Sequence, residues 1–332
     1  MPLGLHLVCR DANGGYDRFP VPERRNVGNW AFFPLYPILV GLVASVSPLS
    51  TIATATLMST LATMGACLLA WPLTDYHPRA YILCCIFFLA GPFSVYFSTL
   101  LSEPLFLLLT AATLLAIKRR AWVGAGLACA ALSATRVVGV LAVFSTLTQM
   151  LRDHLSGGGR LSRFPSTLIA RPDLLVAIFV SPLGLFAYML FLNVTVGDAL
   201  AFSHIQRAFG RMFGDPFTFI LTALTDRPEP GFWFAPRQLS ALAALVGIGL
   251  TGLLVLRRRY AEAAFAALCV VIPIAGGLFS MVRYMAGTMP LVLLAGQEIG
   301  RSREATVLAG VAMLAACPFV TYAWMDANVA LV

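Results

Sequence analysis

Apolar residues fall into long runs that polar stretches separate, and the runs are too long and too uniform for alternating strands. A helix needs roughly 20 apolar residues to cross the hydrocarbon core of a membrane, and shorter runs indicate re-entrant or broken elements. The pattern therefore predicts an all-α fold of about 9–11 membrane helices, some of them broken or interfacial. The runs cover residues 31–47, 50–72, 80–98, 104–117, 121–151, 174–196, 238–256, 261–280, 284–297 and 305–325.

Basic residues in the short connections predict a topology, because cytoplasmic loops are enriched in Lys and Arg. We place Lys118, Arg160, Arg258 and Arg303 inside. Both ends of the run 121–151 then lie inside, so the chain must cross to the outside and return within this run. The run is too short for two full spans. We therefore expect a broken hairpin whose bend faces outward. The same topology places three further residues outside: Glu103, His204 and Arg283.

The first run has two interpretations. Residues 31–47 either span the membrane or stay at the outer face as an interfacial or re-entrant helix, with residues 1–29 outside. The segment FFPLYP favours the second, because proline breaks helices and Trp30 and Tyr36 suit the headgroup layer. We therefore expect a single integral membrane domain over 1–332, with 1–49 as an external-loop and interfacial segment and 197–237 as an external loop.

Composition supports this picture. Of the 332 residues, 59% are hydrophobic and only 11% are charged, and mean hydropathy is +0.84, whereas soluble domains average about 25% charged residues. A water-soluble fold is excluded. The net charge of +8 is better explained by topology than by nucleic-acid binding, so we expect the bilayer and no nucleic acid as a partner. No Gly-rich phosphate loop or metal-ligand cluster is evident, and we expect no metal and no cofactor.

Ionisable residues next to apolar runs converge on the predicted outer side, and such residues are functional candidates by default. Each also has a structural alternative. Glu103 could simply favour the dipole of a helix that starts at Pro104. Arg136 and Arg283 could reach headgroups or helix carbonyls. In the loop 197–217, the residues His204, Gln206, Arg207 and Arg211 could form one solvated face of an amphipathic surface helix.

Five stretches together resemble the PIG-V family of mannosyltransferases, membrane enzymes of the GT-C class that act in GPI-anchor synthesis, and their bacterial relatives. They are spread over about residues 12–295, and the first together with the second is the most specific. They read NWAFFPLYP (29–37), PFSVYFSTLLSEPLF (92–106), RAWVGAGLACAALSATRVVGV (120–140), GDALAFSHIQRAFGR (197–211) and SMVRYMAGTMPLVLL (280–294).

The resemblance implies transfer of a sugar, mannose in that family, from a polyprenyl- or dolichyl-phosphate carrier to an acceptor glycan, lipid or protein. The active site would lie at the outer face of a bacterial plasma membrane, or at the lumenal face of the endoplasmic reticulum. One carboxylate would take the acceptor proton and arginines would hold the leaving phosphate. We expect Asp11, Asp17 or Glu103 as the catalytic carboxylate. The expected substrate-binding residues are Tyr36, Arg136, His204, Gln206, Arg207, Arg283 and Tyr284.

The chain departs from that family at its start. Members begin with a membrane helix, an acidic residue and a stretch like WDxxWYxxIAxxGY, of which ANGGY (12–16) matches the end. Gly4 stands where the acidic residue is expected, and Leu7 and Val8 replace the Trp-Tyr pair. We therefore expect a misassigned start, a truncated chain or an inactive homologue. The rival class is a transporter or lipid flippase, which should show repeats between its halves.

Overall fold

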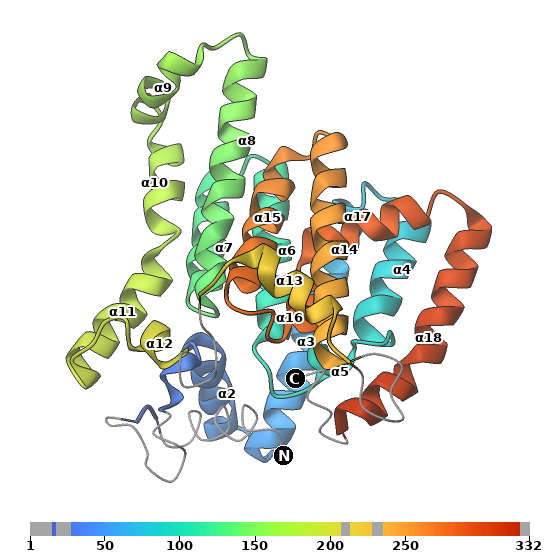
Figure 1. Ribbon diagram of the computed structural model, residues 1–332. Coiled ribbons are helices and arrows are strands. Elements are labelled where there is room, and N and C mark those ends of the chain that lie inside the picture. The colour runs from blue at the N-terminus through green and yellow to red at the C-terminus, as the bar shows by residue number, and fades with distance from the viewer. Residues whose placement is uncertain (1–14, 18–27, 207–212, 228–234, 326–332) are drawn as a thin grey trace.

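The computed structural model describes residues 15–17, 28–206, 213–227 and 235–325. All regular elements in these ranges are helices, so the predicted all-α class is confirmed there (Figure 1). Within the same ranges, four helical stretches are long and apolar enough to cross a membrane. They are Thr51–Leu73, Pro172–Val196, Arg237–Leu256 and Arg303–Trp324.

The aromatic segment before the first helix ends in a turn. A short helix η2 (Asn29–Ala31) precedes Pro34, and α2 (Leu35–Val46) begins directly after that proline. The 12 residues of α2 extend for about 18 Å at the standard helical rise, well short of the roughly 30 Å hydrocarbon core. Its length therefore favours the interfacial or re-entrant interpretation over a full span. Helix α3 (Thr51–Leu73) follows, capped by the Ser50 hydroxyl.

The run 80–98, which we predicted as one element, is broken. Helix α4 (Pro78–Leu89) stops early, and a separate short helix α5 (Val95–Ser98) follows. Gly91 and Pro92 explain the break, because proline cannot donate the next helical hydrogen bond. A Cβ at Gly91 would also lie 2.6 Å from the carbonyl oxygen of Phe87. The prediction of a continuous element was wrong because this Gly-Pro pair was read as part of the apolar run.

The broken hairpin predicted for 121–151 is present. Helix α6 (Glu103–Lys118) is followed by α7 (Trp122–Ser133), a short helix η3 (Val137–Leu141) and α8 (Ala142–Ser156). The backbone is extended at Arg136, with φ −157° and ψ 145°. At Gly139 a Cβ would lie 2.3 Å from the Leu132 carbonyl oxygen, so only glycine lets η3 fold back against the end of α7.

Helices α10 (Pro172–Val180) and α11 (Leu183–Val196) form the run predicted for 174–196, with an interruption at Ser181 and Pro182. A short helix η4 (Leu161–Arg163) and α9 (Phe164–Ala170) connect α8 to α10. The predicted external loop contains α12 (Ala201–His204) and the apolar helix α13 (Pro216–Leu224), which packs against later helices. The Asp215 carboxylate caps α13 through the Thr218 amide, at 2.8 Å.

The C-terminal part contains one long helix, a broken segment and a peripheral helix. Helix α14 (Pro236–Leu256) packs against α15 (Tyr260–Ala275), which ends at two glycines, five residues before the predicted end of its run. The next run is split at Thr288 into α16 (Met281–Gly287) and α17 (Met289–Ile299). Helix α18 (Arg303–Met325) lies at the edge of the array and packs mainly on α4.

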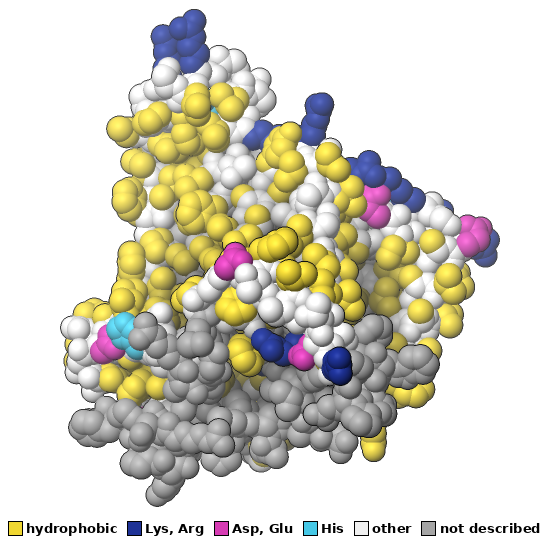
Figure 2. Space-filling view, in the orientation of Figure 1, with side chains coloured by type: hydrophobic (Ala, Val, Ile, Leu, Met, Phe, Trp, Pro, Cys, Tyr) yellow, Lys and Arg dark blue, Asp and Glu magenta, His cyan; other side chains and the backbone are white. Residues whose placement is uncertain are grey.

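The connections group into two opposite ends, as the predicted topology requires. The α8–α9, α14–α15 and α17–α18 connections lie at the upper end of Figure 1, and α2, α12 and α16 lie at the lower end. Figure 2 shows Lys and Arg side chains concentrated at the upper end above a hydrophobic belt. We call these the Lys118 end and the Glu103 end, after the last and first residues of α6. The side of a membrane that each end faces stays a prediction.

Candidate functional site

The site is built around Glu103, the first residue of α6. Pro104 follows it and favours a helix start, and the Glu103 carboxylate lies in the first turn of that helix. The Glu103 side chain is only 4% exposed. A carboxylate buried to this degree needs charged partners, because desolvation otherwise disfavours its ionised form strongly.

The first partner is Arg136, from the break between α7 and η3. Its Nη1 donates a hydrogen bond of 2.7 Å to Oε1 of Glu103. The guanidinium also lies over two aromatic rings, 5.4 Å from the centroid of Phe106 and 4.8 Å from that of Tyr284. Because η3 folds back at Gly139, the extended Arg136 can reach across to α6.

The second partner is Arg283, on α16. Its Nε lies 3.1 Å from the same Oε1 of Glu103, but the N–H direction does not meet hydrogen-bond geometry, and Nε is a buried donor without an acceptor. The contact between Arg283 and Glu103 is therefore an ion pair without a hydrogen bond from Nε. The guanidinium of Arg283 lies 5.7 Å from the ring centroid of Tyr284, so Tyr284 lies close to both arginines.

The three charged groups leave a surplus of one positive charge. Arg136 and Arg283 are 16% and 19% exposed at their side chains, so both reach the surface while Glu103 does not. Because two cations face Glu103, protonating it would leave them opposed, and Glu103 is a poor proton acceptor in this arrangement. It is better suited to hold the two arginines in place than to act as the catalytic base.

The predicted convergence of Arg136 and Arg283 at one depth is therefore found, although their segments are about 150 residues apart. The structure adds two aromatic neighbours that sequence reasoning did not name, Phe106 and the fully buried Tyr96. The charges of Arg283 and Glu103 both act on Tyr96. Tyr96 lies in the stretch 92–106 that carries the family resemblance. This position in the sequence could have identified Tyr96 as a candidate site residue.

Asp17 lies elsewhere, with the aromatic segment before α2. Its amide donates to Oδ1 of Asn29 at 2.9 Å, and its carbonyl accepts from the Trp30 indole at 2.6 Å. Buried Tyr188 of α11 donates to the carbonyl oxygen of Trp30 at 2.8 Å. The segment is thus fastened to α11, and Leu35 at its end donates to the carbonyl of Ala134, two residues before Arg136.

His204 and Gln206 lie in and after α12, beside this aromatic segment. Nδ1 of His204 contacts Oδ2 of Asp198 at 2.7 Å, and both side chains are exposed. The hydrogen bond with His204 holds the pKa of Asp198 below its usual range. Nε2 of Gln206 donates to the carbonyl oxygen of Phe202 at 3.1 Å. These described contacts are local and do not include the three charges at Glu103.

Tyr36 is a packing residue in the structure. It is 2% exposed, and its hydroxyl contacts the Ser59 hydroxyl at 2.7 Å, which fastens α2 to α3. Its position inside this contact gives no support to the substrate-binding role predicted for it. The remaining two predicted site residues, Asp11 and Arg207, lie outside the described residues.

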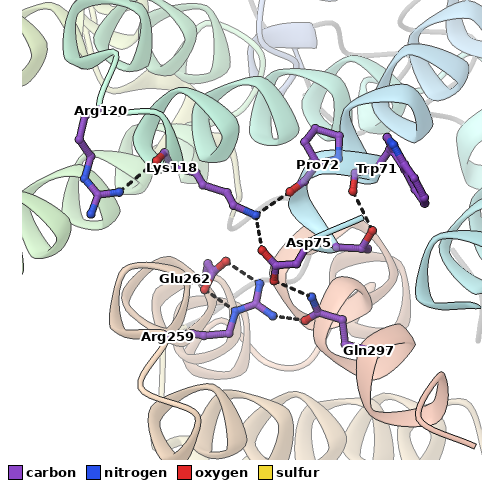
Figure 3. Close-up of polar contacts among 9 residues, drawn as sticks. Trp71, Pro72, Asp75, Lys118, Arg120, Arg259, Glu262 and Gln297 are labelled. Carbon is purple, nitrogen blue, oxygen red and sulfur yellow. Dashed lines mark hydrogen bonds and ion pairs between the residues drawn. The ribbon is translucent and has the colours of Figure 1, made fainter. Parts of the chain in front are cut away.

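A second polar cluster lies at the Lys118 end (Figure 3). Lys118, the last residue of α6, contacts Oδ1 of Asp75 at 2.5 Å, and Gln297 of α17 donates to Oδ2 of Asp75 at 3.4 Å. Arg259 contacts both Gln297 and Glu262. Sequence reasoning used Lys118 only as a topology marker. The partners could not be foreseen, because they come from the α3–α4 connection, the start of α15 and the end of α17.

An apolar cavity of about 310 Å³ lies between α4, α14, α16 and α17. Val282 and Met285 of α16 line it, so α16 has Arg283 facing the charged cluster and its neighbours facing the cavity. The space is lined almost entirely by hydrocarbon groups. It therefore suits an alkyl or isoprenoid chain better than a polar ligand.

Within the described ranges, His, Cys, Asp and Glu side chains do not gather in a group of three or more that could hold a metal ion. Comparisons with protein-family models, with curated proteins and with solved structures each give no match to this chain.

Proposed function

We propose that this chain is a membrane glycosyltransferase that moves a sugar, mannose by the resemblance, from a polyprenyl- or dolichyl-phosphate carrier to an acceptor hydroxyl. The observation that supports it best is the convergence of Arg136 and Arg283 on the buried carboxylate of Glu103. The proposal includes a GT-C-like bundle of about 9–11 membrane helices, with the Glu103 end at the outer or lumenal face.

The charged cluster suits a lipid-linked phosphate. Arginine has a planar fork that can donate to two phosphate oxygens at once. The net charge of +1 on Glu103, Arg136 and Arg283 leaves capacity for an anion. In the reaction, the bond from the sugar C1 to the phosphate oxygen breaks while the acceptor oxygen bonds to C1. The arginines would stabilise the charge that grows on the departing phosphate.

The acceptor hydroxyl must lose its proton, and a carboxylate outside the ion-paired cluster is required for this. Asp17 is the described candidate, because it lies in the segment whose end meets the backbone beside Arg136. The carrier chain would enter the apolar cavity lined by Val282 and Met285. On this arrangement α16 contacts both the phosphate and the first part of the carrier chain.

The test uses the full chain reconstituted in vesicles with radiolabelled polyprenyl-phosphate-mannose and a lipid extract as the acceptor source. Mannose leaves the acid-labile phosphodiester donor and appears in an acid-stable product. Arg283→Ala should lower the rate by about a hundredfold to a thousandfold, the usual effect of losing one electrostatic donor. The control is Arg227→Ala, an exposed arginine between α13 and α14. Equal rates in the two variants would exclude the arginine role.

A second candidate is a transporter or lipid flippase, and one observation favours it. Helix α6 has an ion-paired residue at each end, Glu103 and Lys118, which is an arrangement that two alternating gates could use. The same vesicles distinguish the candidates. A transporter would move the labelled lipid between leaflets without forming a product, and neutralising Lys118 or Asp75 would change that rate.

A further inference from the structure

The connection between α8 and α10 forms a compact cap at the Lys118 end, residues 154–171. Nε2 of His154 contacts the carbonyl oxygen of Arg160 at 2.9 Å, and Nδ1 contacts the Thr167 hydroxyl at 3.3 Å. A Cβ at Gly159 would lie 2.4 Å from the His154 ring. The glycine-rich stretch 156–160 therefore folds against the His154 ring, and the cap has a defined shape.

Basic side chains cover the cap. Arg160 and Arg163 are exposed, and neither has an ion-pair partner among the described residues. Positions 154–171 contain no Asp or Glu. The acidic residues that flank the cap in sequence are already ion-paired, Asp153 with Arg120 at 2.6 Å and Asp173 with Arg171 at 2.7 Å. Figure 2 shows dark blue basic side chains above the position of α9, at the upper extreme of the molecule.

Large aliphatic side chains lie between the arginines. Leu161 is 64% exposed and Ile169 is 73% exposed, although the cap is anchored below by Phe164, which packs against the core around Trp122. The frame of the cap thus holds two large aliphatic side chains outward, beside the arginines in sequence. A phosphate-rich surface with hydrocarbon directly beneath it matches both features.

The position of the cap agrees with such a surface. The apolar stretch Pro172–Val196, long enough to cross a membrane, begins directly after it. The cap therefore lies where an apolar helix leaves the hydrocarbon core. A nucleic acid or an acidic protein would pair with Arg160 and Arg163 but would leave Leu161 and Ile169 in water.

We propose that the cap is a docking surface for anionic phospholipids: Arg160 and Arg163 bind headgroup phosphates while Leu161 and Ile169 enter the headgroup–acyl boundary. This role is independent of sugar transfer. It predicts that the cap responds to phosphatidylglycerol but not to phosphatidylcholine, and that added salt weakens the response.

The experiment places a polarity-sensitive fluorophore on the exposed Ser166 position, by Ser166→Cys in a full chain whose own cysteines are replaced. Vesicles contain phosphatidylcholine with or without phosphatidylglycerol. We expect blue-shifted emission only with phosphatidylglycerol. Arg160→Gln with Arg163→Gln should lower the affinity for anionic lipid about 25-fold, since one basic residue near such a surface contributes about fivefold. The matched control is Arg301→Gln with Arg303→Gln, the same charge change elsewhere at the same end.

Several outcomes would overturn the proposal. One is identical fluorophore emission with both kinds of vesicle. Another is an equal loss of the blue shift in the Arg301→Gln, Arg303→Gln control variant. A third is a blue shift that occurs only when RNA or an acidic peptide is added. If the cysteine-free chain does not fold, native mass spectrometry of the unmodified chain and the same arginine variants measures retained phosphatidylglycerol directly. Equal retention by the cap variant and the control variant would refute it as well.

Discussion

Replacing Glu103 by Gln tests whether the carboxylate organises the two arginines. The substitution keeps the shape and can keep one hydrogen bond from Arg136, but it removes the charge that both cations face. Removing one partner of a buried pair costs about 3–5 kcal/mol. Because the arginines are 16% and 19% exposed and can regain some water, we expect the low end, about 3 kcal/mol of unfolding free energy.

A double-mutant cycle isolates the contact from its surroundings. Glu103→Gln, Arg283→Gln and the combined variant are unfolded in mixed detergent micelles, and the free energy of unfolding is followed by tryptophan fluorescence. We expect a coupling of about 1–2 kcal/mol, within the range for contacting residues. The exposed Glu304→Gln is the control and should leave stability unchanged. Strictly additive costs, or a Glu103→Gln variant as stable as the control, would refute the organising role.

Three further substitutions test the packing that positions the site. Tyr188→Phe removes the hydroxyl that donates to the Trp30 carbonyl at 2.8 Å and should cost about 1 kcal/mol in unfolding free energy, with faster proteolysis before α2. Gly126→Ala places a Cβ 2.7 Å from Cα of Ala177 and should cost about 1–3 kcal/mol by forcing α7 from α10. Gly249→Ala has open space and should not destabilise the chain. Arg259→Ala leaves Glu262 and Gln297 without their donor and should cost about 1–3 kcal/mol in unfolding free energy, whereas exposed Arg258→Ala should cost less. Thermal unfolding of each variant and its control measures these differences.

Hydrophobic pattern and charge placement together predicted much of the arrangement. Most helix limits follow from the runs, and the grouping of the basic connections follows from their charge. The broken hairpin followed from its length and from Arg136 near its middle. The breaks at Gly91 and Thr288 were missed, because an apolar residue count does not register local backbone geometry. Helix α13 was missed because its apolar residues lie inside a longer polar stretch.

The site was predicted in part. The arginine pair could be inferred because charges are costly next to apolar runs, and topology placed both at one end. Their shared contact with Glu103 and their contacts with Tyr284 and Phe106 depend on how η3 and α16 fold back. Tyr36 was assigned to substrate, yet its hydroxyl joins α2 to α3. Sequence position alone does not distinguish an aromatic residue in a site from one in a helix contact.

We propose that Arg136 and Arg283 bind a lipid-linked phosphate, and the decisive experiment measures binding of sugar-free polyprenyl phosphate. The triple variant Glu103→Gln, Arg136→Gln and Arg283→Gln removes the cations without leaving an unpaired charge. Its affinity is compared by native mass spectrometry with wild type and with Arg227→Gln plus Arg237→Gln. We expect an affinity at least tenfold lower in the triple variant, about 1.4 kcal/mol, and no change in the control. Equal affinity in all three proteins would contradict it.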